Sequence, residues 1–232
     1  SQGTRLRVYV DNGSEFTLEQ ELASGFEISN VSISDNVIFV TTSPPSPGGA
    51  VNWFKRKGNV WVEQIPILDG TFATNVVVDD DVMAVLRDDS VMMYSYDGVS
   101  WNADDIADDL GDEVGTQGTW QDVDIDGDYV VLGETTNYYN GIVAQARVFQ
   151  KIAGTWYLDA NLIPVDIRPD DEYGYSVSIE DGVACISGRL NDSSVLNGGM
   201  IAVFKKLNGN WIYTNRVLPY NPVPTMGFGT KI

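Results

Sequence analysis

The chain has 232 residues and carries 14 Lys and Arg against 33 Asp and Glu, a formal net charge of -19. Such a charge repels phosphate backbones and anionic headgroups, and no apolar stretch reaches the roughly 20 residues that cross a bilayer, so we expect no nucleic-acid binding and no membrane insertion. There is no His, so the chain has neither an imidazole base nor an imidazole metal ligand. With a single Cys, Cys185, it cannot form an intrachain disulfide.

Five β-hairpins are predicted along the chain, each built from two alternating apolar and polar runs around a Gly-containing turn. They span residues 6–18, 50–65, 91–102, 146–162 and 201–218. An aromatic residue follows each turn, at spacings of 45, 40, 55 and 55 residues: Phe16, Trp61, Trp101, Trp156 and Trp211. These periods are typical of propeller blades, and aromatics that recur at one place favour packing between blades over sugar-stacking platforms.

A second hairpin precedes each of the last four, at residues 30–40, 75–85, 122–132 and 176–186. Each unit then has four antiparallel strands, and a single such sheet needs neighbours on both faces. We therefore predict an all-β fold, a β-propeller of four-stranded antiparallel blades. Four blades are nearly complete, at about 24–69, 70–107, 108–164 and 165–219, and a partial blade comes from 1–23 and 220–232.

One unit, residues 171–212, reads DEYGYSVSIEDGVACISGR and then, after a loop, NGGMIAVFKKLNGNWI. It resembles the FG-GAP repeats of integrin α-chain propellers, with Tyr173-Gly174 in the FG place and Gly188 in the GAP place. In the preceding unit Gly133 takes the GAP place, while the first two units keep only an aromatic residue of this layout: Phe26 and Phe72. The resemblance implies a secreted protein of the extracellular space, the cell surface or an organelle lumen, with a role in cell adhesion.

The two ends of the sequence fit two arrangements. The C-terminal tail contains Phe228-Gly229, which opens the first strand of another blade, whereas the N-terminus opens on a third strand. Joining the ends would give a five-bladed ring that lacks one strand. Because unpaired strand edges are costly, we favour a segment of a larger propeller, part of a longer chain or complex.

The sharpest motif is Asp122-Val-Asp124-Ile-Asp126-Gly127-Asp128, which superficially matches a D-x-D-x-D-G calcium loop. Its alignment with residues 176–182 places the first two aspartates inside a strand and leaves a turn too tight to wrap a cation. Val130 stands where the resembling family has its final Asp ligand. We therefore expect an ordinary acidic hairpin, with no metal and no cofactor.

Six acidic residues gather between the second and third units: Asp104, Asp105, Asp108, Asp109, Asp112 and Glu113. Because Ile106 and Leu110 stand four residues apart among them, we predict a single helical turn in a linker. Paired carboxylates also serve glycoside hydrolases, but chance pairs must arise in so acidic a chain. We predict no catalytic residues.

The loops that break the repeat are the predicted binding elements. Residues 42–48, 134–140 and 189–198 all follow a second strand, so they should emerge on one rim, where loops vary and partners bind. The candidate binding residues are Tyr138, Tyr139, Asn140, Arg189, Asn191 and Asp192.

These observations favour a non-enzymatic recognition, adhesion or scaffolding module that binds a protein or glycan partner through one rim. One alternative is a multivalent lectin with sugar sites between blades, which predicts repeated pocket residues, although the loops differ from unit to unit. A second alternative is a carboxylate-based glycoside hydrolase. The fold by itself does not decide among these functions.

Overall fold

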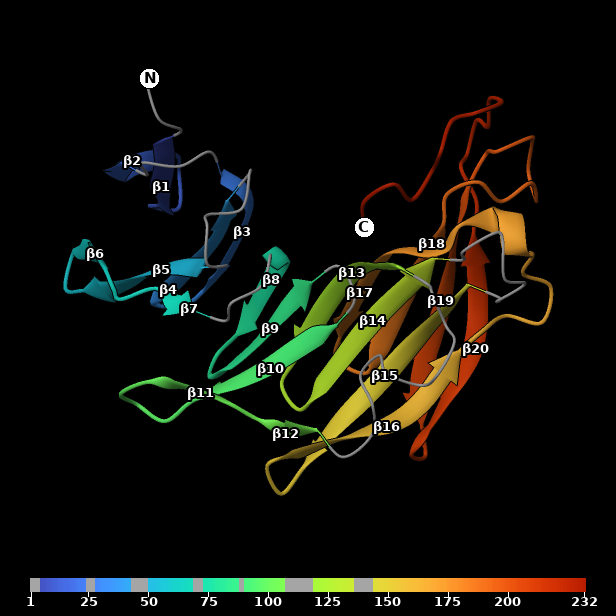
Figure 1. The fold of residues 1–232 in the computed structure, drawn as a ribbon. Coiled ribbons are helices and arrows are strands. Elements are labelled where there is room, and N and C mark those ends of the chain that lie inside the picture. The colour runs from blue at the N-terminus through green and yellow to red at the C-terminus, as the bar shows by residue number, and fades with distance from the viewer. Residues whose placement is uncertain are drawn as a thin grey trace.

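The structure is a computed structural model that describes residues 5–23, 28–42, 50–68, 73–87, 90–106, 119–135 and 144–232. Within these ranges the regular elements are strands, apart from the short 3-10 helix η1 (Pro169–Asp171). In this part of the chain no helix has the length and apolarity that a membrane span needs. Figure 1 shows the sheets following one another in chain order.

Four antiparallel sheets make up most of the described chain, and we call them blades 1 to 4. Blade 1 has β3 (Ile28–Ser34), β4 (Val37–Thr42), β5 (Ala50–Lys57) and β6 (Val60–Glu63), and β7 (Ile67–Leu68) also pairs with β5. Blade 2 has β8 (Ala73–Asp79), β9 (Val82–Arg87), β10 (Val91–Tyr96) and β11 (Trp101–Ala103). Blade 3 has β13 (Thr119–Asp126), β14 (Tyr129–Thr135), β15 (Gln145–Ile152) and β16 (Thr155–Leu162), with β12 (Asp105–Ile106) along β16. Blade 4 has β17 (Tyr173–Glu180), β18 (Val183–Gly188), β19 (Met200–Leu207) and β20 (Asn210–Val217).

A two-stranded sheet of β1 (Arg5–Asp11) and β2 (Phe16–Ala23) precedes blade 1. The nine predicted hairpins are all present in the structure. Their turns use the residues that tight hairpins need: Ala153-Gly154 has φ of 52° and 90°, and Asn208-Gly209 has φ of 53° and 85°. Two successive positive φ values give a turn whose twist matches the flanking strands, so these pairs fix the register of each hairpin.

The core lies between the sheets and divides into one apolar layer for each junction. Blades 3 and 4 share a layer that includes Val148, Tyr173 and Ile186, and blades 2 and 3 share one that includes Met93 and Trp156. Similar layers join blade 1 to blade 2 and to the β1–β2 hairpin. Each blade is thus stabilised by burial against its neighbours, as expected for a sheet that is apolar on both faces.

A polar contact closes the outer edge of the junction between blades 2 and 3. Asp104 accepts hydrogen bonds from Lys151 Nζ at 2.8 Å and from Trp156 Nε1 at 3.0 Å. Lys151 and Trp156 face each other across β15 and β16, with the ammonium 5.5 Å from the centre of the indole ring. Trp156 is 0% exposed, so its N–H requires this acceptor.

The same arrangement, which we call the outer clamp, recurs at two further junctions. Each clamp joins an acid of one unit to a cation and a Trp of the next unit. The acid stands three residues after the aromatic that follows its own hairpin turn. The other two clamps are Glu19 with Arg56 and Trp61, and Asp159 with Lys206 and Trp211. The Trp residues of these clamps therefore pack between blades as predicted, whereas Phe16, which recurs at the same position, is 74% exposed.

The junction of blades 1 and 2 departs from this pattern. Gln64 stands at the position of the acid, and Tyr96 stands at the position of the cation. As a result, the buried Nε1 of Trp101 has no hydrogen-bond partner among the described residues. Aromatic packing replaces the clamp there, with Trp101 at 5.2 Å from both Phe39 and Tyr96 between ring centres.

The predicted helical turn in the acidic linker is wrong for its first residues. Asp105–Ile106 form β12, which pairs in parallel with the edge of blade 3, and Ile106 packs against the apolar layer between blades 2 and 3. Asp104 is committed to its clamp. These long-range contacts stabilise the extended backbone more than one isolated helical turn could. The rest of the acidic stretch, residues 107–113, lies outside the described residues.

Candidate functional site

The first strands of the four blades, β3, β8, β13 and β17, form the inner row of the fold. Each of these strands has one edge without a neighbouring strand in its own sheet. Side chains of one inner strand bond the free N–H groups of the next. Val78 N donates to Ser32 Oγ at 3.0 Å, and Asp80 N donates to Ser34 Oγ at 3.0 Å. This inner ladder satisfies donors that an open strand edge would leave unpaired.

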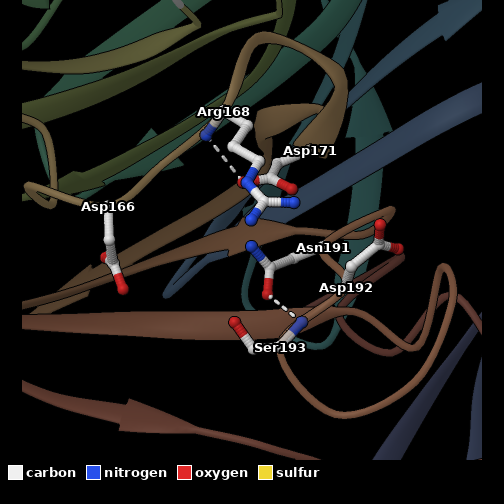
Figure 2. A pocket seen from close by; sticks show the side chains of 6 residues that line it. All are labelled: Asp166, Arg168, Asp171, Asn191, Asp192 and Ser193. Carbon is white, nitrogen blue, oxygen red and sulfur yellow. Dashed lines mark hydrogen bonds between the residues drawn. The ribbon is translucent and has the colours of Figure 1, made fainter.

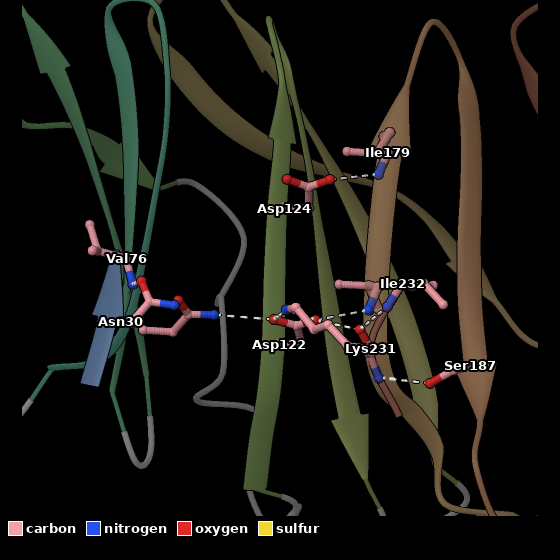
Figure 3. Close-up of polar contacts among 11 residues, drawn as sticks. Asn30, Val76, Asp122, Asp124, Ile179, Ser187, Lys231 and Ile232 are labelled. Atoms are coloured by element: carbon pink, nitrogen blue, oxygen red, sulfur yellow. Dashed lines mark hydrogen bonds and ion pairs between the residues drawn. The ribbon is translucent and has the colours of Figure 1, made fainter. Parts of the chain in front are cut away.

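The calcium-like motif is part of the inner ladder. Asp122, Asp124 and Asp126 accept the backbone N–H groups of Val177 at 3.2 Å, Ile179 at 2.9 Å and Asp181 at 2.8 Å. Figure 3 shows Asp124 directed across the junction to Ile179. Because the three residues alternate along β13, their carboxylates lie in a row on one face of the strand and bond three different amides. They do not converge on one point, as the ligands of a calcium loop do. In the described ranges no three His, Cys, Asp or Glu residues are grouped as metal ligands.

Burial acts on one of these carboxylates. Burial raises the pKa of Asp124, while hydrogen bonds from the Ile179 and Ile125 N–H groups partly oppose that effect. The side chain therefore lies in a partly dehydrated junction, where amide donors stabilise its charge.

An axial pocket of about 240 Å³ opens where the inner row begins. Four of its residues stand at one repeat position: Asn30, Asn75, Asp122 and Ser176. Asp122 is 4% exposed and its carboxylate accepts Asn75 Nδ2 at 3.1 Å, Ser176 Oγ at 2.8 Å and Lys231 Nζ at 2.9 Å. Figure 3 shows Lys231 reaching Asp122 across the inner row. Both carboxylate oxygens are therefore already engaged by donors.

The C-terminal tail extends the inner row beyond β17. Ile232 N donates to Ser176 Oγ at 3.2 Å, as Val177 N donates to Asp122 one blade earlier. Gly229 has φ of 88° and a Cβ there would lie 2.8 Å from Ser187 Cβ. Gly174 has φ of 84° and a Cβ there would lie 2.7 Å from Gln145 O. Phe228-Gly229 thus packs on blade 4 much as Tyr173-Gly174 packs on blade 3, in line with its predicted role.

Gly133 and Gly188, which the sequence comparison of the units places at one repeat position, are not equivalent in the structure. A Cβ on Gly133 would lie 2.1 Å from Gly174 O, so this close approach of two backbones requires glycine. A Cβ on Gly188 would meet only ordinary contacts, the nearest at 3.4 Å. Gly133 pairs with Ala146 in blade 3, and the residue at the corresponding place in blade 4 is Ser187, which pairs with Ile201. The structural counterpart of Gly133 is therefore Ser187 and not Gly188.

A second pocket, the rim pocket, lies where the chain passes from blade 3 to blade 4. It has a volume of about 150 Å³ and an entirely polar lining: Asp166, Arg168, Asp171, Asn191, Asp192 and Ser193. Figure 2 shows the side chains converging from the segment before β17 and from the loop after β18. The loop is the predicted binding loop 189–198, so the structure brings it together with a segment that sequence reasoning did not select.

Two deeply buried polar side chains form the floor of the rim pocket. Asp171 is 2% exposed and accepts the N–H of Arg168 at 2.8 Å. Asn191 is 4% exposed, and its Oδ1 accepts Ser193 N at 2.9 Å. The Nδ2 group of Asn191 faces the pocket in Figure 2 and has no partner among the residues that the structure describes. An amide donor and a carboxylate acceptor therefore both line the pocket, and Figure 2 draws the Arg168 guanidinium between them.

Charges of both signs stand around this floor. Arg216 donates to Ser193 Oγ at 2.8 Å and forms an ion pair with Asp166. Asp192 uses one oxygen to accept Asn197 N at 2.7 Å, which fixes the bend of the loop. Arg168 is exposed at the mouth.

The predicted site residues are divided by the structure. Asn191 and Asp192 line the rim pocket. Arg189 turns away from it, pairs with Glu172, and lies over the ring of Tyr175 with its guanidinium carbon 3.8 Å from the ring centre. Tyr138, Tyr139 and Asn140 lie outside the described residues. The missed residues Asp166, Arg168 and Asp171 carry a local signal, the turn sequence Arg-Pro-Asp-Asp before an FG element.

No family model and no curated protein sequence matches the chain, so the FG-GAP resemblance gains no support there. Solved structures do match. A protein from Lactobacillus plantarum is similar with a TM-score of 0.64, at 12% identity over 95% of this chain and 65% of its own. A candidate 6-phosphogluconolactonase from Bacteroides uniformis gives 0.63, at 13% identity over 94% of this chain and 66% of its own. The fold is a β-propeller.

A functionally unknown protein from Desulfotomaculum acetoxidans is also similar, with a TM-score of 0.61, 12% identity, and coverage of 97% of this chain and 67% of its own. The chain thus spans about two thirds of the length of these propellers. Identities this low establish the propeller architecture, and the sites of this chain must be argued from its own residues.

Proposed function

We propose that this chain is a non-enzymatic recognition module that binds a protein partner through the rim of the propeller around the rim pocket. Binding there follows from surface complementarity. The FG-GAP resemblance supports placing the module outside the cell, at the cell surface or in an organelle lumen, with adhesion or scaffolding as its role.

The observation that carries the proposal is the pairing of a polar pocket with exposed apolar side chains beside it. Leu196 is 63% exposed and stands in the same loop as Asn191 and Asp192. Val223 is 58% exposed, and its segment is tied to the loop by a 2.9 Å hydrogen bond from Thr225 N to Leu196 O. Exposed apolar side chains beside polar groups occur together in protein interfaces, which combine an apolar centre with a polar rim.

The chemistry of the buried carboxylates supports recognition over catalysis. Asp122 is saturated by donors, and the Asp124 and Asp126 carboxylates bond backbone amides. A glycoside hydrolase needs two free carboxyl groups on either side of a bond, and these aspartates are occupied in holding blades together. The absence of His from the sequence removes the commonest general base.

Site-specific photocrosslinking tests the proposal. A photoreactive residue in place of Leu196 should crosslink one defined protein from extracellular material of the source organism. The matched control is Val99, equally apolar and 85% exposed, in the turn between β10 and β11 at the opposite end of a blade. D192R should abolish the Leu196 crosslink. Equal labelling from both positions would refute the rim as the binding surface, and a glycan as the crosslinked species would replace the protein partner.

A further inference from the structure

We infer that the rim pocket binds one neutral polyhydroxylated unit, such as a monosaccharide residue, so that the partner recognised at this rim is a glycosylated one. The inference rests on the proposed function, because it names the chemical group that enters the pocket beside the apolar anchors.

The first step is the character of the pocket floor. Asn191 Nδ2 offers N–H donors and the Asp171 carboxylate offers acceptors, and both residues are more than nine-tenths buried. Polar groups that face a small pocket bond water in the free protein, and a ligand that displaces this water binds well only if its own groups replace these hydrogen bonds. A hydroxyl group both donates and accepts, so two neighbouring hydroxyls can bond an amide and a carboxylate together.

The second step is charge. Three carboxylates line the pocket, from Asp166, Asp171 and Asp192, and they disfavour an anionic ligand. Arg216 is paired with Asp166, and the Arg168 guanidinium offsets a second carboxylate, so little net charge remains to attract a cation. A neutral ligand avoids repulsion from the carboxylates, and charged groups of both signs strengthen hydrogen bonds to its hydroxyls.

The third step is the predominantly polar character of the lining. All six lining side chains are polar or charged. An Asn or Gln side chain from a partner would bring methylene groups into these surroundings without apolar contacts, whereas a sugar has hydroxyls around most of its periphery. The volume of about 150 Å³ suits a single sugar unit.

The test is an NMR titration of the isotopically labelled protein with glucose, galactose, mannose, fucose and N-acetylglucosamine. At least one sugar should cause saturable shifts confined to the amides of residues 166–171 and 191–199. D171N keeps an acceptor for Arg168 N but loses the charge and should weaken binding about tenfold or more. E180Q removes the same charge at an exposed turn at the far end of the blade and should leave binding unchanged.

Three outcomes would overturn the inference: no saturable shift with any sugar, equal shifts with glycerol, or binding that D171N leaves intact. Stronger shifts of the same amides with lysine amide or inorganic phosphate would show that the charge argument is wrong. If the sugars fail but the Leu196 crosslink to a protein stands, the inference falls and the proposed function survives.

Discussion

Removing the acid of one outer clamp should strongly destabilise the propeller. Lys151 and Asp104 are 13% and 10% exposed, so the substitution D104A leaves a nearly buried ammonium without its counter-ion and the Trp156 N–H without an acceptor. Breaking a buried ion pair costs about 3–5 kcal/mol, and an unsatisfied donor costs about 1–3 kcal/mol. Because both losses come from one acceptor, they overlap, and we expect the free energy of unfolding to fall by about 3–5 kcal/mol.

Urea denaturation followed by tryptophan fluorescence measures this loss. The matched control is T214A, at the same repeat position of blade 4, where the exposed Thr214 donates a hydrogen bond to Val203 O at 3.1 Å. It should change the free energy of unfolding by no more than about 0.5 kcal/mol. The double variant D104L/K151M removes both charges and should recover most of the stability lost in D104A. The reasoning fails if D104A is no more destabilising than T214A.

Three further predictions concern the inner row. Neither calcium nor a chelator should shift the melting temperature in a thermal scan, because the carboxylates of residues 122–126 already bond backbone N–H groups; a rise of several degrees with calcium would contradict this. G174A should lower the free energy of unfolding strongly, because its Cβ would lie 2.7 Å from Gln145 O at φ of 84°. G13A has a similar φ of 87° but open space around it, so urea denaturation should show a much smaller loss. D124N should stabilise the protein at pH 7, because burial raises the Asp124 pKa and so penalises the charged form. That gain should disappear as the pH falls through this raised pKa, because Asp124 of the unsubstituted protein is then protonated in both the folded and the unfolded state. Urea denaturation of both proteins at pH 7 and pH 3 measures the difference.

Most of the fold could be predicted from the sequence, because the signals for hairpins and repeats are local. Turn pairs such as Asn208-Gly209 and alternating runs such as Val177 to Ile179 fix strand direction and register without any knowledge of neighbours. The recurring aromatics gave the blade period, and from it the packing between blades. The acid three residues after Phe16, Trp101 and Trp156 was visible too, but its partners stand 37 to 52 residues further along the chain, so its role was not.

The candidate site was only partly predictable. Asn191 and Asp192 were found because their loop breaks the repeat. Asp171 was missed because its importance depends on burial between two segments, a property that a row of acidic residues does not reveal. Arg189 was selected by the same reasoning as Asn191, and yet the cation–π contact with Tyr175 directs it away from the rim pocket.

The fold class and the order of the blades were thus determined by the sequence itself, since hairpins and repeats depend on residues close together in the chain. Tertiary structure alone decided what the aspartates do. Asp104 anchors a clamp and does not belong to a helical turn, Asp122, Asp124 and Asp126 accept backbone amides of the next blade, and Asp171 faces a pocket. The reason is that a carboxylate takes its role from the donors around it, and those donors come from another blade.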